Sequence, residues 1–392
     1  MQELSQDGKL NQVSTLCHYF QSQECKSCQW IEHPYSQQLI HKENILRKAL
    51  QISPNFQLEQ SVSSPVLEFR NRAKMIVTGT TYHPIIGLTG EENLDEGREI
   101  LQCPIHHPRL NEVIQALPEF IQTFNLTPYQ IDSRKGELKG VILFYSPVTD
   151  QMYLRFILRS QECVFRIKKL LPSLQKKFPF ITCVSANIQP IPHAFLDGPE
   201  EIFITEQNFI AYQLGKLVLN LAPQAFVQTN TEVAIQLYQT AANWIKAIHP
   251  NKMLDLFCGQ GAFSFFAAWS SKYILGIEIN EEAVNTANKT AARLGFYHVS
   301  FQCMDAKLAP SLGADLILVN PPRRGLTQTL KVIEQSLPEH LIYSSCSIDT
   351  LAKDMSVLTK NYTLEKIQIF DMFPHTEHFE ILLLLKKSKV TS

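Results

Sequence analysis

Residues 253–264 read Met-Leu-Asp-Leu-Phe-Cys-Gly-Gln-Gly-Ala-Phe-Ser. A short apolar run, typical of a buried strand, enters a turn with two glycines and continues into a sequence rich in alanine and phenylalanine. Glycines in such a turn let the backbone approach a ligand at the N-terminus of the next helix. The pattern predicts the first strand, turn and helix of an α/β sheet, although Gly-x-Gly alone is a weak signal.

The sequence after this turn keeps alternating between strand-like and helix-like runs. Strands are predicted at 273–279, 299–304, 314–319 and 341–345, with helices at 281–294, from about 326, and at 348–358. The closing runs 366–370 and 379–385 have no helix between them and predict an antiparallel pair. We expect a Rossmann-like α/β domain over residues 223–392, with a seven-stranded, mostly parallel sheet whose last strand is antiparallel.

The sequence before residue 223 has a different texture. Short strand-like runs at 74–80, 140–145, 152–158 and 181–188 are separated by turn residues. They predict a separate α+β domain over residues 1–222.

The composition is that of an ordinary globular protein. Of its 392 residues, 45% are hydrophobic, and 36 basic residues balance 37 acidic ones. No apolar run approaches the length of a membrane span, and the first residues lack the features of a secretory signal. We therefore expect a cytoplasmic protein without a membrane partner, and no obligate protein partner is evident.

A carboxylate at the end of the second strand narrows the choice of ligand. Glu278 follows Gly276-Ile277, at the position where such folds bind ribose hydroxyls. Both NAD and S-adenosylmethionine (SAM) carry that ribose. Ser264 stands where the third glycine of a dinucleotide motif would be, and Asp255 would suit the SAM cation and repel a pyrophosphate. The residues therefore favour SAM.

Two further strands end in residues that suggest chemistry. The run Asn320-Pro-Pro-Arg-Arg-Gly follows one strand, and proline fixes φ and keeps the preceding residue extended. The next strand ends in Tyr-Ser-Ser-Cys346, where a cysteine is either a small core residue or a nucleophile at the ligand edge of the sheet. The first run also occurs in SAM-dependent amino methyltransferases, which is an alternative chemistry for this site.

These motifs, taken in order, resemble those of the RNA uracil-C5 methyltransferases along nearly the whole chain. The matching blocks are Cys-x7-Cys-x2-Cys, Phe69-Arg-Asn-Arg-Ala-Lys, Gly136-Glu-Leu-Lys, Phe226-Val-Gln-Thr-Asn, Asp-Leu-Phe-Cys-Gly, Asn-Pro-Pro-Arg-Arg-Gly, Tyr-Ser-Ser-Cys and Asp371-Met-Phe-Pro-His-Thr-Glu-His-Phe-Glu. Two departures, Gln260 and Ala262, are minor.

The resemblance implies a role for each matching residue. Cys346 would be the nucleophile and Glu380 the general base, whereas the SAM site would be lined by Gln228, Phe257, Glu278 and Asn320. The substrate would be 23S rRNA, entering the site as a flipped-out uracil. A different rRNA or tRNA uracil, and a non-catalytic RNA-binding protein of ribosome assembly, remain alternatives.

Nine cysteines in a cytoplasmic-looking chain suggest metal or catalytic roles more than disulfides. Four of them, Cys17, Cys25, Cys28 and the remote Cys103, form a set that suits an iron–sulfur cluster or zinc. A single Cys-x2-Cys pair is more typical of a cluster, and the resemblance implies [4Fe-4S]. Cys17 also lies too near the start for an OB-like domain, so the chain is most similar to the group that methylates uracil 747 of 23S rRNA.

Basic and aromatic residues supply candidates for RNA contact. The stretches Phe69–Lys74 and Arg134–Lys139, together with Arg323-Arg324, would hold phosphates. A flipped base could stack on Phe263 or Phe373. The histidines of Pro374–Glu380 would shape their loop or touch phosphate, with a metal site as the alternative because His378 and Glu380 share a strand face.

Overall fold

The computed structural model describes residues 17–89, 96–192, 197–310 and 313–388. Two compact units are present: Met1–Cys28 with Pro65–Gln224, and Gln29–Ser64 with Ala225–Ser392. The second boundary lies next to the one predicted at residue 223, and the segment Gln29–Ser64 packs with the C-terminal unit. Among the described helices, none has both the length and the apolar composition needed to cross a membrane.

The second unit is built on a seven-stranded sheet with the order β12-β11-β10-β13-β14-β16-β15. All its pairings are parallel except those of β16, which runs antiparallel to β14 and to β15. The prediction of a Rossmann-like sheet with an antiparallel last strand is confirmed. The strands are β10 (Lys252–Leu256), β11 (Tyr273–Glu278), β12 (Val299–Cys303), β13 (Leu316–Val319), β14 (His340–Ser345), β15 (Tyr362–Phe370) and β16 (Glu380–Lys387).

Helix α8 (Glu281–Leu294) begins and ends at residues that cap it. In α8, the Asn280 side chain accepts a hydrogen bond from the Ala283 amide at 2.9 Å, and Gly295 ends the helix at φ +73°. The helices of this unit are α3 (Tyr35–Ala49), α6 (Thr231–Ile248), α7 (Ala262–Ala267), α8 (Glu281–Leu294), α9 (Leu330–Ser336) and α10 (Ile348–Leu358), with short 3₁₀ turns η2 (Ala306–Leu308) and η3 (Thr327–Thr329).

One hydrophobic core joins the sheet to its helices. Leu254, Ile317 and Leu341 of neighbouring strands are fully buried in it. Burying each such side chain contributes about 1.5–3 kcal/mol. Leu46 of α3 is equally buried in the same core, so a helix from the start of the chain is part of this unit.

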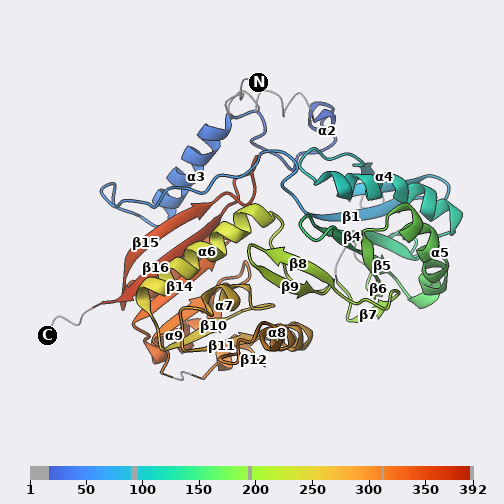
Figure 1. The fold of residues 1–392 in the computed structure, drawn as a ribbon. Coiled ribbons are helices and arrows are strands. Elements are labelled where there is room, and N and C mark those ends of the chain that lie inside the picture. Colours follow the sequence, from blue (N-terminus) through green and yellow to red (C-terminus); the bar gives the residue numbers. More distant parts are fainter. Residues whose placement is uncertain (1–16, 90–95, 193–196, 311–312, 389–392) are drawn as a thin grey trace, which may run out of the picture. The chain divides into compact units, whose positions relative to one another are not determined.

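The segment that contains α3 also extends the sheet. The Glu59 and Val62 amides donate to the carbonyls of Ile367 and Ile369 on β15, at 3.0 and 2.8 Å. In Figure 1, the blue α3 therefore belongs with the red strands β15 and β16, although they come from opposite ends of the chain. The periodicity of the C-terminal sequence did not predict that residues 29–64 would pack with this sheet.

The first unit contains a second seven-stranded sheet, with the order β3-β2-β1-β4-β5-β6-β7, and a two-stranded sheet of β8 and β9. The strands are β1 (Arg72–Gly79), β2 (Pro84–Thr89), β3 (Gly97–Glu99), β4 (Leu138–Ser146), β5 (Gln151–Leu158), β6 (Ile181–Ile188), β7 (Glu200–Phe203), β8 (Ile210–Leu214) and β9 (Leu217–Leu221). The helices are α2 (His18–Gln21), α4 (Pro108–Thr123) and α5 (Val164–Lys177), with a 3₁₀ turn η1 (Gln161–Cys163).

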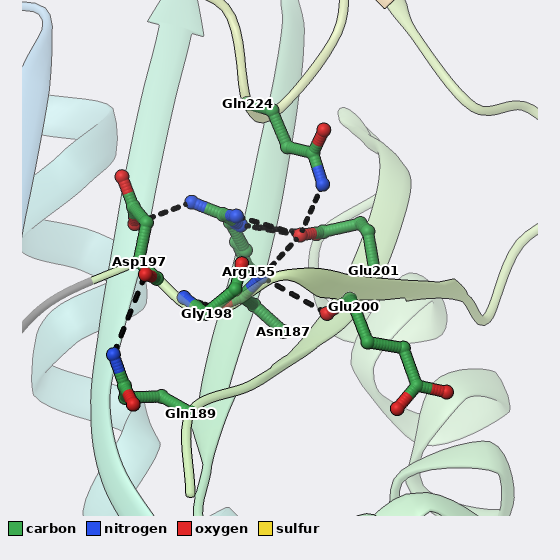
Figure 2. Close-up of polar contacts among 8 residues, drawn as sticks. All are labelled: Arg155, Asn187, Gln189, Asp197, Gly198, Glu200, Glu201 and Gln224. Carbon is green, nitrogen blue, oxygen red and sulfur yellow. Dashed lines mark hydrogen bonds and ion pairs between the residues drawn. The ribbon is translucent and has the colours of Figure 1, made fainter. Parts of the chain in front are cut away.

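Within this unit, a buried arginine ties three strands together (Figure 2). The Arg155 side chain on β5 is 1% exposed and donates to both carboxylate oxygens of Glu201 on β7, at 2.6–3.0 Å. Asp197 accepts a further bond at 2.7 Å. Asn187 on β6 and Gln224 also donate to Glu201, at 2.9 and 3.1 Å. Each buried charge is thus paired, as burial demands.

We expect Arg155→Met to destabilise the first unit by about 3–5 kcal/mol, because it leaves Glu201 as an unpaired buried charge. Arg109→Met is the matched control, since the Arg109–Glu112 pair is 39% and 46% exposed and should contribute less than about 1 kcal/mol. Denaturant unfolding of both variants measures the difference. Equal losses would contradict the role assigned to the buried network.

Candidate active site

The reversed direction of β16 brings Cys346 and Glu380 together. Ser345, at the end of β14, pairs with Ile381, near the start of β16. Cys346 and Glu380 are therefore neighbours across the two strands, and burial together with the charge of Glu380 raises the pKa of the Cys346 thiol. The ends of these two strands thus meet at one edge of the sheet.

Glu380 is a buried carboxyl group held by two donors. Its side chain is 1% exposed, and the Ser344 hydroxyl donates to Oε1 at 2.7 Å. The Gln228 side chain makes the other hydrogen bond. Burial raises the pKa of Glu380 to about 7, and these two bonds oppose the rise because they favour the charged form. The group can therefore accept or hold a proton near neutral pH.

The Arg323 guanidinium affects the pKa of the Cys346 thiol. Burial and the charge of Glu380 raise the pKa of this thiol, whereas a charge interaction and a hydrogen bond from Arg323 lower it. The thiolate is the nucleophilic form of cysteine. The sequence offered no activator for Cys346, and in the structure the Arg323 guanidinium offsets part of the rise in the pKa of this thiol.

The loop that carries Arg323 is fastened to α10. The buried carboxylate of Asp354 accepts hydrogen bonds from the Tyr343 hydroxyl at 2.6 Å and from the Leu326 amide at 2.9 Å. Gly325 has φ +76°, and a Cβ there would lie 2.8 Å from Asp354 Oδ2. The glycine of Asn-Pro-Pro-Arg-Arg-Gly is therefore required by this close approach.

The hydroxyl groups around the cysteine also have identifiable partners. Ser344 holds Glu380, while the Ser345 hydroxyl accepts from the Ser347 amide at 3.2 Å and donates to its carbonyl at 3.1 Å. These bonds fix the turn in which Cys346 lies. Sequence reasoning had not assigned a role to Ser344.

Cys346 opens onto a pocket of about 400 Å³. Its walls are polar on several sides and come from four parts of the second unit. They consist of Ile45 of α3, Arg323, residues 346–349 and residues 377–379. The thiol therefore has space beside it for part of a substrate.

Glu278 lies at the Gly-rich turn predicted to bind the cofactor. Its carboxylate accepts hydrogen bonds from the amides of Gly259, Ile279 and Asn280, at 3.1, 2.8 and 2.9 Å. These bonds hold both oxygens at the end of β11, beside the turn after β10. The arrangement fits a nucleoside whose ribose hydroxyls donate to the same carboxylate.

Packing explains one glycine of the turn. Gly261 has φ +83°, and a Cβ on it would lie 2.5 Å from the Phe301 ring.

Asp255, which the sequence suggested for the SAM cation, is fully buried and accepts a 2.6 Å bond from Ser264. Burial raises the pKa of Asp255 to about 7, and the bond from Ser264 ties the end of β10 to the first turn of α7.

The other residues predicted to line the cofactor site do not all lie in the same place. Phe257, at φ +61°, and Asn320 are half-buried at the ends of β10 and β13. Gln228, predicted to line the cofactor site, contacts Glu380. The prediction that Phe263 could stack on a base is wrong, because its ring is 4% exposed and packs on Tyr238 at 4.8 Å between centroids.

Sequence comparisons agree with this geometry. Residues 202–307 and 300–388 match a family model described as tRNA (Uracil-5-)-methyltransferase. The 23S rRNA (uracil(747)-C(5))-methyltransferase of Enterobacter sp. (strain 638) is 41% identical over 376 residues, or 95% of this chain and 100% of the relative. The protein of the same name from Vibrio vulnificus (strain CMCP6) is 40% identical over 94% of this chain and 99% of its own. The chain belongs to the RNA uracil-C5 methyltransferase family.

A solved structure supports the fold assignment for this RNA uracil-C5 methyltransferase. The Pyrococcus abyssi tRNA (uracil-54, C5)-methyltransferase, crystallised with S-adenosyl-L-homocysteine, superposes with a TM-score of 0.77. The match covers 92% of this chain and 85% of that one at 24% identity. Similarity at this level establishes a shared fold.

The four predicted cluster ligands lie in the first unit. The Tyr19 hydroxyl of α2 accepts from the Leu101 and Gln102 amides at 2.9 and 3.0 Å, which holds the Cys17 segment near Cys103. The thiols of Cys17, Cys25, Cys28 and Cys103 interact electrostatically in all six pairs. Among the described residues, no three His, Cys, Asp or Glu side chains are arranged to hold a single metal ion.

Burial and mutual repulsion resist ionisation of these thiols. Both effects raise the pKa of Cys28 to about 12, and burial raises that of Cys103 to about 11. The Arg70 guanidinium opposes the rise at Cys28. Arg70 was expected to contact phosphate, but it interacts with the thiols, and the neighbouring Phe69 is buried.

Proposed function

We propose that this protein transfers a methyl group from SAM to C5 of a uracil in 23S rRNA, at the position numbered 747 in the names of its relatives. The observation that carries the proposal is the adjacency of Cys346 and a buried Glu380 across β14 and β16. One residue can attack the ring and the other can take up a proton, within reach of a single base.

The chemistry requires both groups. The Cys346 thiolate adds to C6 of the uracil, and the electrons of the C5–C6 double bond make C5 nucleophilic. SAM supplies an electrophilic methyl group on its sulfonium, which C5 accepts. Glu380 then removes the C5 proton, the double bond re-forms, and the thiolate leaves from C6. Covalent catalysis thus divides one difficult step into easier ones.

The surroundings of the two groups bear on these roles. Burial and the charge of Glu380 raise the pKa of the Cys346 thiol, and the Arg323 guanidinium opposes that rise by favouring the thiolate needed for attack. Glu380 must be ionised to remove the C5 proton, and a pKa of about 7 makes it a base poised near neutral pH. After the reaction it holds the proton, which it can release to solvent as product leaves.

The methyl donor would bind at the turn after β10. Glu278 would accept from the ribose hydroxyls, with Phe257 and Asn320 at the ends of neighbouring strands. Gln228, which contacts Glu380, would link the donor site to the base. All of these residues belong to the second unit.

We further propose that Cys17, Cys25, Cys28 and Cys103 hold a [4Fe-4S] cluster. Support comes from the electrostatic interactions among the four thiols, which involve every pair of them. The positive charge of Arg70 beside Cys28 also suits an anionic group. The cluster would belong to the first unit, which would be an RNA-binding domain, whereas the second unit would be the methyltransferase domain. Anaerobically purified protein should contain about four irons per chain, and Cys28→Ser should lose them.

The test of the function is methyl transfer from labelled SAM to 23S rRNA that lacks its uracil methylations. We expect one labelled 5-methyluracil, mapped to the 747 position. A labelled methyl group on C5 of another uracil would change the assigned target nucleotide but support the same reaction mechanism. Label on an exocyclic amine would favour the amino-methylation alternative carried by Asn320-Pro-Pro. RNA binding without transfer would favour a non-catalytic role.

Ser344→Ala should change the pH dependence of proton removal. Its hydroxyl bond to Glu380 favours the ionised base, so its loss should raise the pKa of Glu380 further above 7. A bond to a charged group is worth about 1.5–3 kcal/mol, which corresponds to a shift of roughly one to two pH units. Release of the methylated RNA, followed from pH 6 to pH 9, should rise at higher pH in the variant. Ser356→Ala on the exposed face of α10 is the control, and an unchanged profile in Ser344→Ala would contradict the assignment.

A further inference from the structure

The loop that precedes Glu380 has an unusual environment. We call residues 371–379, between β15 and β16, the base loop. His375 at its centre is fully buried and has φ +67°, a conformation that residues with side chains rarely adopt. Residues 377–379 of the same loop line the Cys346 pocket. The path of the base loop therefore affects both the base and the pocket.

A buried ion pair from α3 fixes the start of the base loop. The Lys42 ammonium donates to Asp371 Oδ1 at 2.6 Å, and both side chains are 0% exposed. It also donates to the Phe373 carbonyl at 3.1 Å. A single side chain thus holds the base loop at two points.

A second polar side chain of α3 fixes the centre of the base loop. Gln38 Oε1 accepts from the His375 amide at 2.8 Å, and its Nε2 lies 3.3 Å from His375 Nδ1. The same Nε2 donates to the carbonyls of Trp30 and His33 at 3.0 and 2.9 Å. The Trp30 amide in turn donates to the His375 carbonyl at 2.9 Å. Both backbone groups of the strained residue are therefore satisfied from the α3 segment.

We propose that Gln38 and Lys42 are positioning residues that set the course of the base loop and so place Glu380 for proton removal. The proposal rests on the function proposed above. Apolar side chains of similar volume can replace a buried ion pair without loss of stability, so stability alone does not account for burying Lys42 and Asp371 in this place. The contacts act on the loop that leads directly into the base.

The order of the chemical steps gives this role its own signature. Cys346 addition and methyl transfer come before Glu380 acts. A displaced base therefore slows only the last step, and the methylated RNA remains covalently attached to Cys346. A variant that is merely less stable loses active enzyme in every step equally and does not enrich this adduct.

Two variants test the proposal in the full-length protein. Lys42→Met/Asp371→Asn removes both charges while keeping the side-chain volumes, and Gln38→Met removes the hydrogen bonds to the base loop. Ile333→Ala on α9 is the control, because it truncates a fully buried side chain of the same core away from the base loop. The readouts are the single-turnover rate of methyl transfer, the rate of RNA release, the denaturant-stable adduct and the unfolding midpoint.

We expect both variants to transfer the methyl group within about twofold of the wild-type rate and to release RNA at least about tenfold more slowly, since small displacements of a reacting group have effects of this size. The adduct should accumulate in both variants and not in Ile333→Ala. If the double variant does not fold, Gln38→Met decides the question.

Wild-type release rates in a folded Gln38→Met variant would overturn the proposal. Equal slowing of every step together with a lowered unfolding midpoint, as expected for Ile333→Ala, would also overturn it. Failure of the wild-type protein to methylate or to form any adduct would instead refute the proposed function, and this inference would fall with it.

Discussion

Cys346→Ala should abolish methyl transfer, with a loss of at least about 10⁴-fold, because the Cys346 thiol lines the pocket next to Glu380 and is the group proposed to add to C6. Without that addition C5 lacks the electron density to attack a methyl group. The fold should be unaffected, since Cys346 is only half-buried. Labelled SAM, 23S rRNA and a denaturing gel measure both product and covalent adduct, and both should be absent.

Cys163→Ala provides a matched control for the loss of a thiol. Cys163 is buried in the first unit, at the start of α5, and belongs to neither the active site nor the four-cysteine set. Its replacement should leave methylation and adduct formation near wild-type levels. Full activity of Cys346→Ala would show that Cys346 is not the nucleophile. Amino methylation at Asn320 would then be the better interpretation.

Glu380→Gln should stop the reaction one step later. The amide has the shape of the carboxyl group and its oxygen can still accept from Ser344, but it cannot take up the C5 proton. Thiol addition and methyl transfer should proceed, so the enzyme should accumulate methylated RNA bound to Cys346. The adduct should survive denaturation, and turnover should fall by about 10²–10⁴-fold.

The same substitution should change stability with pH. The pKa of Glu380 is raised from 4.5 to about 7 in the folded protein, so ionising it costs stability as pH rises through this interval. The difference of about 2.5 units corresponds to about 3 kcal/mol. At pH 8 Glu380→Gln should therefore be more stable than wild type by up to that amount, whereas at pH 4 the two should be similar. Rapid turnover by the variant, or equal stability at pH 8, would contradict the role of a buried base.

Local signals made much of the C-terminal fold predictable. Helices 281–294 and 348–358 were predicted with the bounds that the structure has, because the helix-like pattern of each run stops at these residues, and in the first helix Asn280 and Gly295 also cap the ends. The antiparallel β15–β16 pair followed from two apolar runs without a helix between them. Cys346 and Glu380 could be placed together because one ends a parallel strand and the other begins a reversed one.

Contacts between residues far apart in the sequence could not be predicted in this way. Nothing in the periodicity of α3 indicates that Gln38 and Lys42 reach the base loop, because the partner of a buried polar side chain depends on the tertiary fold. The same holds for Ser344, which follows a strand pattern like any small residue, and for Arg70, whose charge suggested phosphate. Phe263 looked available for stacking because sequence alone does not show that Tyr238 covers it.

The contact between Lys42 and Asp371 also bears on how the protein is made. The two residues are 329 positions apart, so the base loop meets its anchor only after the long stretch between them has been synthesised. Contacts of such long sequence separation form late in folding, since closing the intervening chain carries an entropic cost. Until that contact forms, a nascent chain would carry its nucleophile without a positioned base.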